Sequence, residues 1–514
     1  MSPTLGYNFS HMKILSAEQV RAWDQYTILH EPIASIDLME RAAAACTEWL
    51  EEHAFTDHHI WICCGKGNNG GDGLAIARQL AVRRVPVKVC ILEFGHKGTD
   101  DFQTNLARLH QLPQVEIRFL QSSEHIPEFR PDEIIIDALY GSGLNRGIEG
   151  MTASLVDAMN RSGALNISID IPSGMFTDHS SAGNTIVKAV YTLSFQTWKQ
   201  GFMHAENGPF LGEVQILDIG LHGEYYAEVD PVYELADDEM IGRIYKPRDP
   251  WGHKGKFGHA LLLAGSFGKM GAAVLSSRSC LRSGVGLLTC QVPASGYTIL
   301  QTAVPEAMCI ADPHPTFLTK TDGFFSKYAS IGIGPGIGTD TETMKMLRYL
   351  LIHAGVPLVI DADALNMIAA SADLLEKIPP GSILTPHPKE FERLFGKISN
   401  DFDRIALAQQ KADELQITII LKNHYSFIAS PGRKGIFNGT GNAGMATGGS
   451  GDVLTGILTG LQAQGYAPHE AAVLGVYLHG LAGDLAAKAI SEEALTASDI
   501  TDHLGQAFLR IKEL

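Results

Sequence analysis

The sequence predicts two consecutive α/β domains, each built on a parallel sheet with helices on both faces. Apolar, strand-like runs alternate with helical stretches through both halves of the chain. The chain has 514 residues, more than the size at which a single hydrophobic core keeps growing. Between Leu217 and Trp251 the apolar periodicity gives way to acidic and turn-forming residues. We therefore predict a doubly wound, Rossmann-like domain at residues 12–227 and a second α/β domain at residues 228–514.

The composition is that of a globular protein with small ligands. Hydrophobic residues make up 45% of the chain and charged residues 19%, which argues against disorder. A formal net charge of -17 argues against nucleic acid or an anionic membrane as the main partner, although a local pocket could still hold phosphates. The seven cysteines form no Cys-x-x-Cys pair, and no apolar stretch is expected to reach the roughly 18 residues of a membrane span. We predict a cytoplasmic protein, and we leave Met1–His11 out of the predicted fold.

The first half begins with helices and continues as alternating strands and helices. Ser16-Ala-Glu-Gln-Val has the form of a helix N-terminus, and a second helix is expected from about Ile36 to Leu50. The apolar run His59–Cys64 leads into a glycine-rich segment, and helical periodicity resumes at Leu74. This order predicts a strand, a turn and a helix that begins near Asp72. Further strands are expected at residues 87–92, 133–139, 166–171 and 191–195.

The second half repeats this alternation after the boundary. Neither half contains a short internal repeat or a low-complexity tract, which excludes solenoid and fibrous folds. Because ligands of doubly wound sheets bind at the carboxyl ends of the strands, polar residues that follow strands are candidate site residues. Strands are expected to start at His259 and to cover residues 330–334, 357–361, 381–385, 417–421 and 427–429.

Three polar clusters follow strands of the first half, at residues 68–72, 137–147 and 170–174. The carboxyl ends of parallel strands meet at one edge of a sheet, so the three clusters can converge. Glycines let the backbone approach a ligand closely, and the N-terminus of the helix that follows the first cluster attracts anionic oxygens. A diphosphate is therefore a suitable ligand for this edge.

Two kinds of chemistry fit the side chains of these clusters. The oxygens of Asn69, Asp137 and Ser173 are of the type that holds a hard cation. Asp170 is the best placed acid or base. Each cluster taken singly is also typical of a structural turn or cap, so the prediction depends on their joint occurrence.

The motifs Asn68-Asn-Gly-Gly-Asp72, Asp137-x-x-x-Gly-x-Gly and Asp170-x-Pro-Ser-Gly, in this order, resemble the epimerase domain of the NAD(P)H-hydrate repair family. This resemblance implies that Asn69, Asp137 and Ser173 bind potassium and that Asp170 contacts the reacting ring. It also implies that hydrated NADH or NADPH is held by Asn68, Asn69, Gly70, Gly71, Asp72, Gly141, Ser142, Gly143, Leu144, Asn145, Arg146 and Gly147.

The reaction implied by the resemblance suits a carboxylate. Hydration of the nicotinamide ring leaves a hydroxyl on a carbon beside the ring nitrogen, and the nitrogen can expel it to form an iminium that takes up water on either face. A general acid or base at that carbon accelerates both directions, and we expect Asp170 to serve. Lys199, which follows a strand, is either another site residue or a solvated surface lysine, and the sequence leaves both open.

Four segments of the second half carry similar signals, at residues 334–338, 359–366, 385–391 and 442–452. The last precedes an apolar helix, so its N–H groups form an anion cradle at the helix N-terminus. Ribokinase-like enzymes use a comparable Gly-x-Gly-Asp turn, in which the aspartate is a base and the backbone neutralises phosphate charge. A carboxylate between glycines at a helix N-terminus has few packing roles, so we predict that Asp452 is catalytic.

Together these segments resemble the dehydratase domain of the same family, over about residues 240–510, with a ribokinase-like fold. The resemblance implies that Ala272, Gly336, His387 and Asp452 contact the hydrated cofactor. The family usually has Lys-Gly-x-x-Thr where this chain reads Lys422-Asn-His-Tyr-Ser426, which weakens the case for nucleotide binding at that loop. The nucleotide, ADP or ATP, would be bound by Lys422, Asn423, His424, Tyr425, Ser426, Asn442, Ala443, Gly444, Met445, Ala446, Thr447, Gly448, Gly449, Ser450 and Gly451.

Structural roles compete with the functional ones for several residues. His387, between two prolines, could satisfy a turn carbonyl, and Asp361 and Asp363 could be structural caps below their strand. A ribokinase-like small-molecule kinase fused to a nucleotide-binding scaffold domain is the alternative function, which the Asp-Ala-Asp-Ala-Leu-Asn run disfavours.

We therefore expect an epimerase at residues 12–227, a nucleotide-dependent dehydratase at residues 228–514, and self-association into a homo-oligomer. The choice between ADP and ATP, and a role for Mg²⁺, are left open by the sequence.

Overall fold

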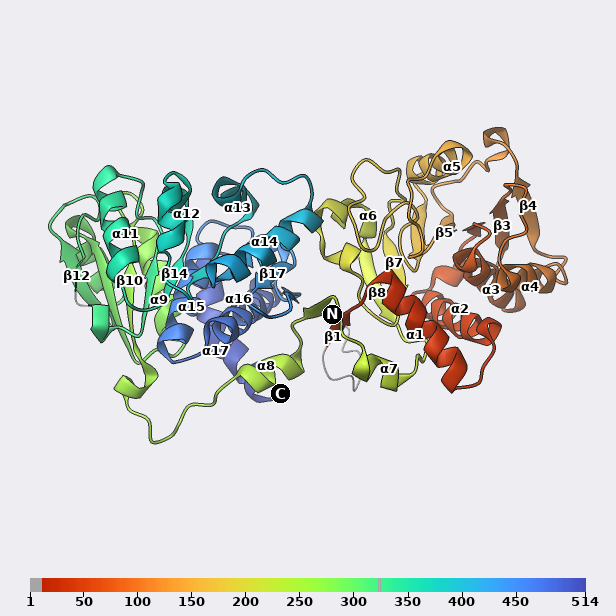
Figure 1. Ribbon diagram of the computed structural model, residues 1–514. Coiled ribbons are helices and arrows are strands. Elements are labelled where there is room, and N and C mark those ends of the chain that lie inside the picture. Colours follow the sequence, from red (N-terminus) through yellow and green to blue (C-terminus); the bar gives the residue numbers. More distant parts are fainter. Residues whose placement is uncertain (1–11, 322, 324) are drawn as a thin grey trace. The chain divides into compact units, whose positions relative to one another are not determined.

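The computed structural model describes residues 12–321, 323 and 325–514, and Met1–His11 lie outside them (Figure 1). Contacts divide the chain into two compact units. The first unit extends to Tyr233 and includes residues 400–402, and the second contains the rest. The predicted boundary between residues 227 and 228 falls inside helix α7 (Gly223–Glu228), whereas the chain passes from one unit to the other after Tyr233.

The first unit contains a seven-stranded sheet in which every neighbouring pair is parallel. The strand order is β4-β3-β2-β5-β6-β7-β8, so the chain reverses its direction of travel across the sheet between β2 and β5. In such sheets this switch point is where ligands bind. The strands are β2 (Ile60–Cys64), β3 (Val87–Leu92), β4 (Glu116–Leu120), β5 (Ile134–Ala138), β6 (Leu165–Ile169), β7 (Tyr191–Phe195) and β8 (Glu213–Leu217).

Successive residues of β2 pack into separate hydrophobic clusters on the two faces of this sheet. Ile62 packs with residues of α2, α3 and α4, whereas Trp61 and Cys63 pack with residues of α5. A strand that is buried on both faces needs a helical layer on each side, which confirms the doubly wound prediction. The remaining elements are β1 (Met12–Ile14), α1 (Ala17–His30), α2 (Ser35–Glu52), α3 (Asn68–Val82), α4 (Asp100–Leu109), α5 (Gly150–Arg161) and α6 (Gly208–Leu211).

The second unit contains a larger, mostly parallel sheet with the order β9-β18-β17-β16-β15-β14-β13-β10-β11-β12. Only β17, among these described strands, runs antiparallel to its neighbours β16 and β18. The strands are β9 (Tyr233–Leu235), β10 (His259–Leu263), β11 (Leu287–Pro293), β12 (Met308–Asp312), β13 (Ser330–Ile333), β14 (Leu358–Ile360), β15 (Ile383–Leu384), β16 (Thr418–Leu421), β17 (Ser426–Ala429) and β18 (Ile436–Asn438).

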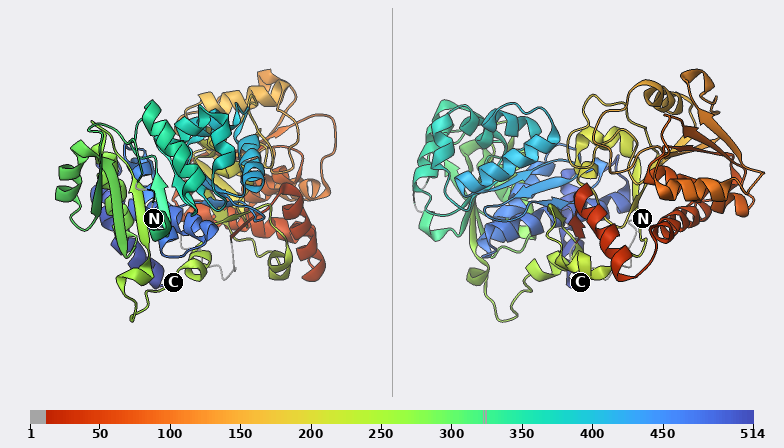
Figure 2. Two further views of the ribbon diagram at one scale, coloured as in Figure 1. Left: turned by 60° about the vertical axis from the view of Figure 1, so that its left-hand side comes forward. Right: turned by 45° about the vertical axis from the view of Figure 1, so that its right-hand side comes forward.

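Helices cover both faces of the second sheet, with α15 to α17 on one face and α11 and α12 on the other (Figure 2). Helix α15 packs tightly on α9, since a Cβ atom at Gly456 would lie 2.0 Å from the Ser279 hydroxyl oxygen. This packing fixes the helix that carries Asp452. The helices are α8 (Asp238–Ile244), α9 (Met270–Arg282), α10 (Tyr297–Ala303), α11 (Thr341–His353), α12 (Ala362–Ala369), α13 (Pro388–Phe395), α14 (Asp401–Leu415), α15 (Ser450–Ala463), α16 (Pro468–Ile490) and α17 (Ala497–Lys512).

One expectation from the composition is wrong. Helix α16, with 23 residues, is long and apolar enough to cross a membrane by length and composition. However, 61% of its most apolar window is buried inside the structure, and its Val473, Leu474 and Leu478 belong to a hydrophobic core cluster. A central helix of a large core is apolar all round for this reason.

Candidate active sites

The glycine-rich segment after β2 is the start of α3. The sequence predicts that this helix begins near Asp72, but it begins one turn earlier, at Asn68. A Cβ atom at Gly70 would lie 1.9 Å from the carbonyl oxygen of Gly65, and one at Gly71 would lie 2.8 Å from the Met39 sulfur. The glycines therefore allow the first turn of α3 to pack closely, and the N–H groups of that turn lie at the carboxyl end of β2.

Asp170 follows β6 and is held in a strained backbone conformation with φ of 69°. Its Oδ1 lies 2.8 Å from the Nζ of Lys199, and its Oδ2 accepts a hydrogen bond of 2.8 Å from the backbone N–H of Ser142. Burial by itself raises the pKa of Asp170, but the charge of Lys199 and these hydrogen bonds outweigh it, so the pKa lies below the usual value. Asp170 is therefore ionised at neutral pH.

Lys199 is a site residue by position, because its side chain is fully buried. The alternative of a solvated surface lysine is excluded. Its ammonium also donates to the hydroxyl of Ser194 on β7. The segment after β7 thus supplies the cation that keeps Asp170 charged, and Ser194 of β7 holds that cation in place.

Asp137 and Ser173 lie side by side as predicted, but most of their hydrogen-bonding capacity is used between themselves. The Ser173 hydroxyl donates to Asp137 Oδ1 at 2.6 Å, and the Ser173 N–H donates to Oδ2 at 2.8 Å. Ser168 and the backbone of Leu139 donate to the same carboxylate. Asn69 differs, since it is 8% exposed and neither its Oδ1 nor its Nδ2 has a hydrogen-bond partner among the described residues. Within this trio, the unsatisfied oxygen that a cation could use belongs to Asn69.

The loop at residues 141–147 closes over Asp170. A Cβ atom at Gly141 would lie 2.7 Å from Asp170 Oδ2, so glycine is required for this approach. Gly143, Asn145, Arg146 and Gly147 are exposed and accessible to a ligand. The guanidinium of Arg21, on α1, lies beside this loop, 3.5 Å from the position of a Cβ atom at Gly143.

Two further carboxylates face Asp170. Burial, the charge of Asp170 and the charge of Asp24 raise the pKa of Asp72, in the first turn of α3, well above its usual value. Burial and the charge of Asp170 raise the pKa of Asp24, on α1, to about 7, against the opposing charges of Lys199 and Arg21. The sequence analysis did not single out Asp24. A signal was present, because the helical spacing from Val20 and to Thr27, both buried, places Asp24 near the buried face of α1.

In the second unit, Asp452 lies in the first turn of α15, as predicted. The residue before the helix, Gly449, has φ of 93°, which favours glycine. Burial, and then the negative charges of Asp361 and Asp363, raise the pKa of Asp452 to about 6, against the opposing charge of Lys422. Its carboxylate therefore titrates close to neutral pH, as suits a general base.

Lys422 and Asp361 form a partly buried ion pair beside this turn. The Nζ of Lys422 lies 2.9 Å from Asp361 Oδ1, and the hydroxyl of Thr455 donates to Oδ2 at 2.8 Å. The pair lies against the glycine-rich turn, because the Lys422 Nζ is 3.5 Å from the position of a Cβ atom at Gly451. Lys422 thus lies beside the glycine-rich turn that the sequence predicts to bind the nucleotide. Asn423 and His424 are exposed in the turn between β16 and β17.

The interpretation of Asp361 and Asp363 as structural caps needs revision. The carboxylate of Asp361 is used by Lys422 and Thr455, although the residue occupies the N-cap position of α12. Asp363 accepts a hydrogen bond of 2.8 Å from the N–H of Gly338 and so holds the glycine turn after β13. In that turn, a Cβ atom at Gly336 would lie 3.0 Å from the Cβ of Ala272, so these two predicted substrate contacts are neighbours.

His387 is the N-cap residue of α13. Its Nδ1 accepts hydrogen bonds from the backbone N–H groups of Lys389 and Glu390, at 3.1 and 3.4 Å, and does not serve a turn carbonyl. Burial lowers the pKa of the imidazole, in the face of the opposing charge of Glu390. With Nδ1 accepting, the neutral ring carries its proton on Nε2, which lies 3.6 Å from Glu390 Oε2.

Two residues that the sequence analysis missed support the glycine-rich turn from α16. The carboxylate of Asp484 accepts hydrogen bonds from the N–H of Gly441 and the amide of Asn442, each at 2.9 Å. His479 Nε2 lies 3.3 Å from the hydroxyl of Ser450, and burial lowers the pKa of this histidine to about 4. A neutral histidine here adds no positive charge to the cradle.

Neither site contains a ready-made cluster for a transition metal, since the described residues include no group of three or more His, Cys, Asp or Glu side chains that could hold an ion.

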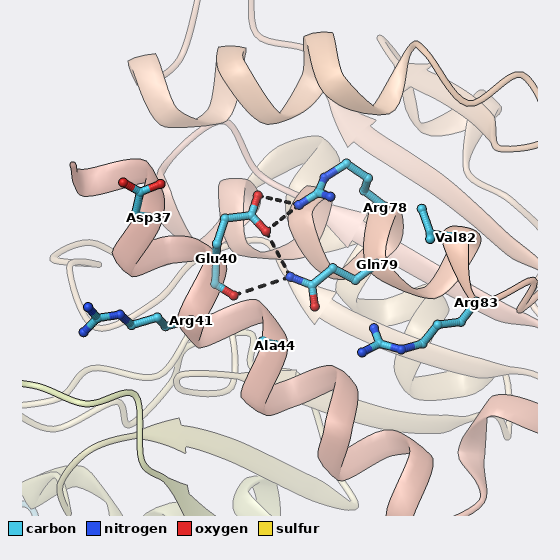
Figure 3. Close-up of a pocket in the computed structure, with 8 residues that line it drawn as sticks. All are labelled: Asp37, Glu40, Arg41, Ala44, Arg78, Gln79, Val82 and Arg83. Carbon is cyan, nitrogen blue, oxygen red and sulfur yellow. Dashed lines mark hydrogen bonds and ion pairs between the residues drawn. The ribbon is translucent and has the colours of Figure 1, made fainter. Parts of the chain in front are cut away.

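A hollow of about 660 Å³ lies elsewhere, on helices α2 and α3 of the first unit (Figure 3). Its arginines are engaged by glutamates: Arg78 pairs with Glu40, and Arg83 pairs with Glu51. These neutralised charges give the hollow little to bind an anionic ligand with.

Comparison with known proteins decides the family. The family model described as the YjeF-related protein N-terminus matches residues 35–201, and the model described as NAD(P)H-hydrate dehydratase matches residues 260–506. The bifunctional NAD(P)H-hydrate repair enzyme Nnr of Moorella thermoacetica is 33% identical over 98% of this chain and 98% of its own length. The chain belongs to the bifunctional NAD(P)H-hydrate repair enzymes. Another member of this family, from Thermofilum pendens, is 31% identical over 98% of this chain and 97% of its own length.

The family membership confirms the resemblance inferred from the motifs. The residues that the two family models match include Asp170 in the first and Asp452 in the second, whereas Asp24 precedes the matched residues 35–201. A crystal structure of ADP/ATP-dependent NAD(P)H-hydrate dehydratase from Bacillus subtilis, co-crystallized with ATP/Mg²⁺, is 30% identical with a TM-score of 0.46. The match covers 54% of this chain and 98% of the Bacillus subtilis chain.

Proposed function

We propose that this chain repairs hydrated NADH and NADPH by two reactions, an epimerisation in the first unit and a nucleotide-dependent dehydration in the second. The observation that carries the proposal is the presence of two convergent polar sites, at the carboxyl ends of two separate sheets, in a chain that aligns with bifunctional repair enzymes over nearly its whole length. A dehydratase that accepts one epimer strands the other, so an epimerase on the same chain makes the repair complete.

The first site suits reversible loss of the hydroxyl beside the ring nitrogen. The N–H groups at the start of α3 and the exposed loop at residues 141–147 would hold the dinucleotide. Asp170 is ionised and fixed by Lys199, so it can stabilise the cationic iminium and take a proton from the water that adds to it. The strained backbone at Asp170 is consistent with a residue whose position is set by function.

We also propose potassium at Asn69, Asp137 and Ser173. The support is the buried amide of Asn69, whose oxygen has no partner among the described residues. The carboxylate of Asp137 already accepts four hydrogen bonds, so we expect it to contribute little to the binding of the potassium ion. When bound, the cation would supply positive charge near the diphosphate.

In the second site, the proposed nucleotide, ADP or ATP with Mg²⁺, would place its phosphates on the N–H groups at the start of α15, near the Lys422 ammonium. Asp452 would take the proton of the substrate hydroxyl. The hydroxyl oxygen would attack the terminal phosphate of the nucleotide and then leave as phosphate, with both electrons of its bond to carbon. Loss of a proton from the neighbouring ring carbon would restore the dihydropyridine. The cytoplasmic location and the self-association of the chain also stay proposals.

The test is the recovery of NADH from a mixture of the two hydrate epimers, followed by the near-ultraviolet absorbance that only NADH shows. We expect the protein with ADP or ATP to convert the whole mixture. Asp170→Asn should convert only the S epimer on the same time scale, and Asp452→Asn should convert neither. No recovery with either nucleotide would refute the proposal and favour the alternative small-molecule kinase, which should instead yield a stable phosphorylated product.

A further inference from the structure

The first site contains more carboxylates than its lysine can neutralise. Lys199 is fully buried and is in direct contact with Asp170. The charge of Asp170 raises the pKa of both Asp24 and Asp72, so the three carboxylates interact, and the ion pair of Lys199 is with Asp170. Burial and mutual repulsion raise the pKa of Asp24 to about 7 and that of Asp72 well above its usual value. A protonated carboxyl beside Asp170 can donate a proton.

Helix α1 is firmly placed beside this cluster. The Ser16 capping box begins the helix, and the carboxylate of Asp178 accepts a hydrogen bond of 3.0 Å from the N–H of Ala17. The buried indole of Trp23 donates to the carbonyl oxygen of His222 at 2.8 Å. On the same helix, the Arg21 guanidinium lies beside the substrate loop at Gly143. Asp24 lies three residues after Arg21 on this helix, and its carboxylate interacts electrostatically with Asp170 and Lys199.

The reaction needs a proton donor, and Asp170 cannot fill this role. A hydroxyl leaves an uncharged carbon as water only when it receives a proton, and Asp170 is held in its ionised form by Lys199. Two carboxylates whose surroundings push their pKa values apart identify the acid and the base of a site. Asp170 has the lowered pKa, whereas Asp24 and Asp72 have raised ones, and the pKa of Asp24, about 7, lies in the neutral range in which a general acid is effective.

We propose, on the basis of the function proposed above, that Asp24 is the proton donor of the epimerisation and that Asp170 is its proton acceptor. The Asp24 carboxyl protonates the substrate hydroxyl, the carbon–oxygen bond breaks with both electrons on the departing water, and the ring nitrogen forms the iminium double bond. A water then adds to the other face of that carbon, and its proton passes to Asp170. Proton exchange with solvent returns both carboxyls to their starting states.

The proposal predicts a limb in the pH profile. Asp24 must be protonated to act, so kcat/KM for epimerisation should fall as the pH rises through the pKa of about 7. The charged groups that face Asp24 and set this limb are Arg21 on its own helix, Asp72 on α3, Asp170 after β6 and Lys199 after β7.

The experiment compares Asp24→Asn with Glu18→Gln, which removes an exposed carboxylate of the same helix. Epimerisation is measured by separating the R and S hydrates of NADH, without nucleotide. We expect kcat to fall at least about 100-fold in Asp24→Asn, with KM within a few-fold and the alkaline limb lost. Glu18→Gln should match the wild type, and Asp24→Glu should regain part of the rate together with the limb.

Dehydration of the pure S epimer by the same preparations serves as an independent readout, because it depends on Asp452. An Asp24→Asn protein that epimerises within ten-fold of the wild type, or that keeps the alkaline limb, would overturn the proposal and leave the repair function intact. An equal loss in Asp24→Asn and Asp24→Glu with raised KM would make Asp24 a structural residue, which also overturns it. Absence of epimerisation in the wild type would instead refute the repair function.

Discussion

The two sites use the same parts in opposite ways. Each places an aspartate near a lysine at the carboxyl end of a parallel sheet. In the first, Lys199 touches Asp170 directly and keeps its pKa low. In the second, Lys422 is taken up by Asp361, and burial with the surplus negative charge raises the pKa of Asp452 to about 6. The pKa of the aspartate in each site therefore depends on which carboxylate the lysine contacts.

The largest effect is expected from removing the direct contact. Lys199→Met leaves the carboxylate of Asp170 buried without its cation, and breaking such a pair costs about 3–5 kcal/mol. Four of the five tryptophans lie in the first unit, and the fifth, Trp251, is 93% exposed. Tryptophan fluorescence during urea unfolding therefore reports chiefly on the first unit, and its midpoint should fall.

The double variant Lys199→Met/Asp170→Asn is the control, because it removes the stranded charge. It should recover part of the lost free energy of unfolding. A loss below about 1 kcal/mol in the single variant would show that solvent, and not the lysine, stabilises Asp170.

An opposite and smaller effect is expected in the second unit. The pKa of Asp452 is raised by folding to about 6, so its ionisation opposes folding above that pH and not below about pH 4. Asp452→Asn should therefore raise the free energy of unfolding by about 1–3 kcal/mol at pH 8, and leave it unchanged at pH 4. The measurement is far-ultraviolet circular dichroism of the transition that tryptophan fluorescence does not report. A variant that is less stable at pH 8 would contradict the raised pKa.

The parts of each site that follow strands could be predicted from the sequence. Strands buried on both faces are strongly apolar, so the polar residues at their ends, such as Asp137 and Asp170, stand out, and parallel pairing brings them together. Asp452 stood out for a similar reason, because glycines surround it at the start of an apolar helix. The predictions missed strands β4 and β8 of the first unit and β11, β12 and β18 of the second. Most side chains of β4 and β8 are exposed or half-buried, so their apolar signal is weak.

Other features depend on tertiary contacts that leave little local trace. Asp24 reaches the first site from a helix that lies well over one hundred residues earlier in the chain than Asp170, and no spacing rule connects the two. The burial of Lys199 depends on the packing around β7, and the segment Thr197-Trp-Lys-Gln-Gly201 could equally have formed a surface turn. The early start of α3 goes against the low helix propensity of Gly70 and Gly71, and it is imposed by neighbours that leave no room for a side chain.

The smallest effect is expected in the second site, from a substitution that releases Lys422 from its ion pair with Asp361. Asp361→Asn removes one charge that raises the pKa of Asp452 and releases Lys422, which lowers it. If Asp452 acts as the base, kcat/KM for dehydration of the S epimer rises with pH through its pKa. This limb should move to lower pH by about one unit in the variant. Asp363→Asn is the matched control, since Asp363 raises the same pKa less and does not contact Lys422, so its shift should be smaller. Equal shifts in the two variants would mean that Lys422 has no part in setting the charge of Asp452, and the contrast between the two sites would then rest on burial alone.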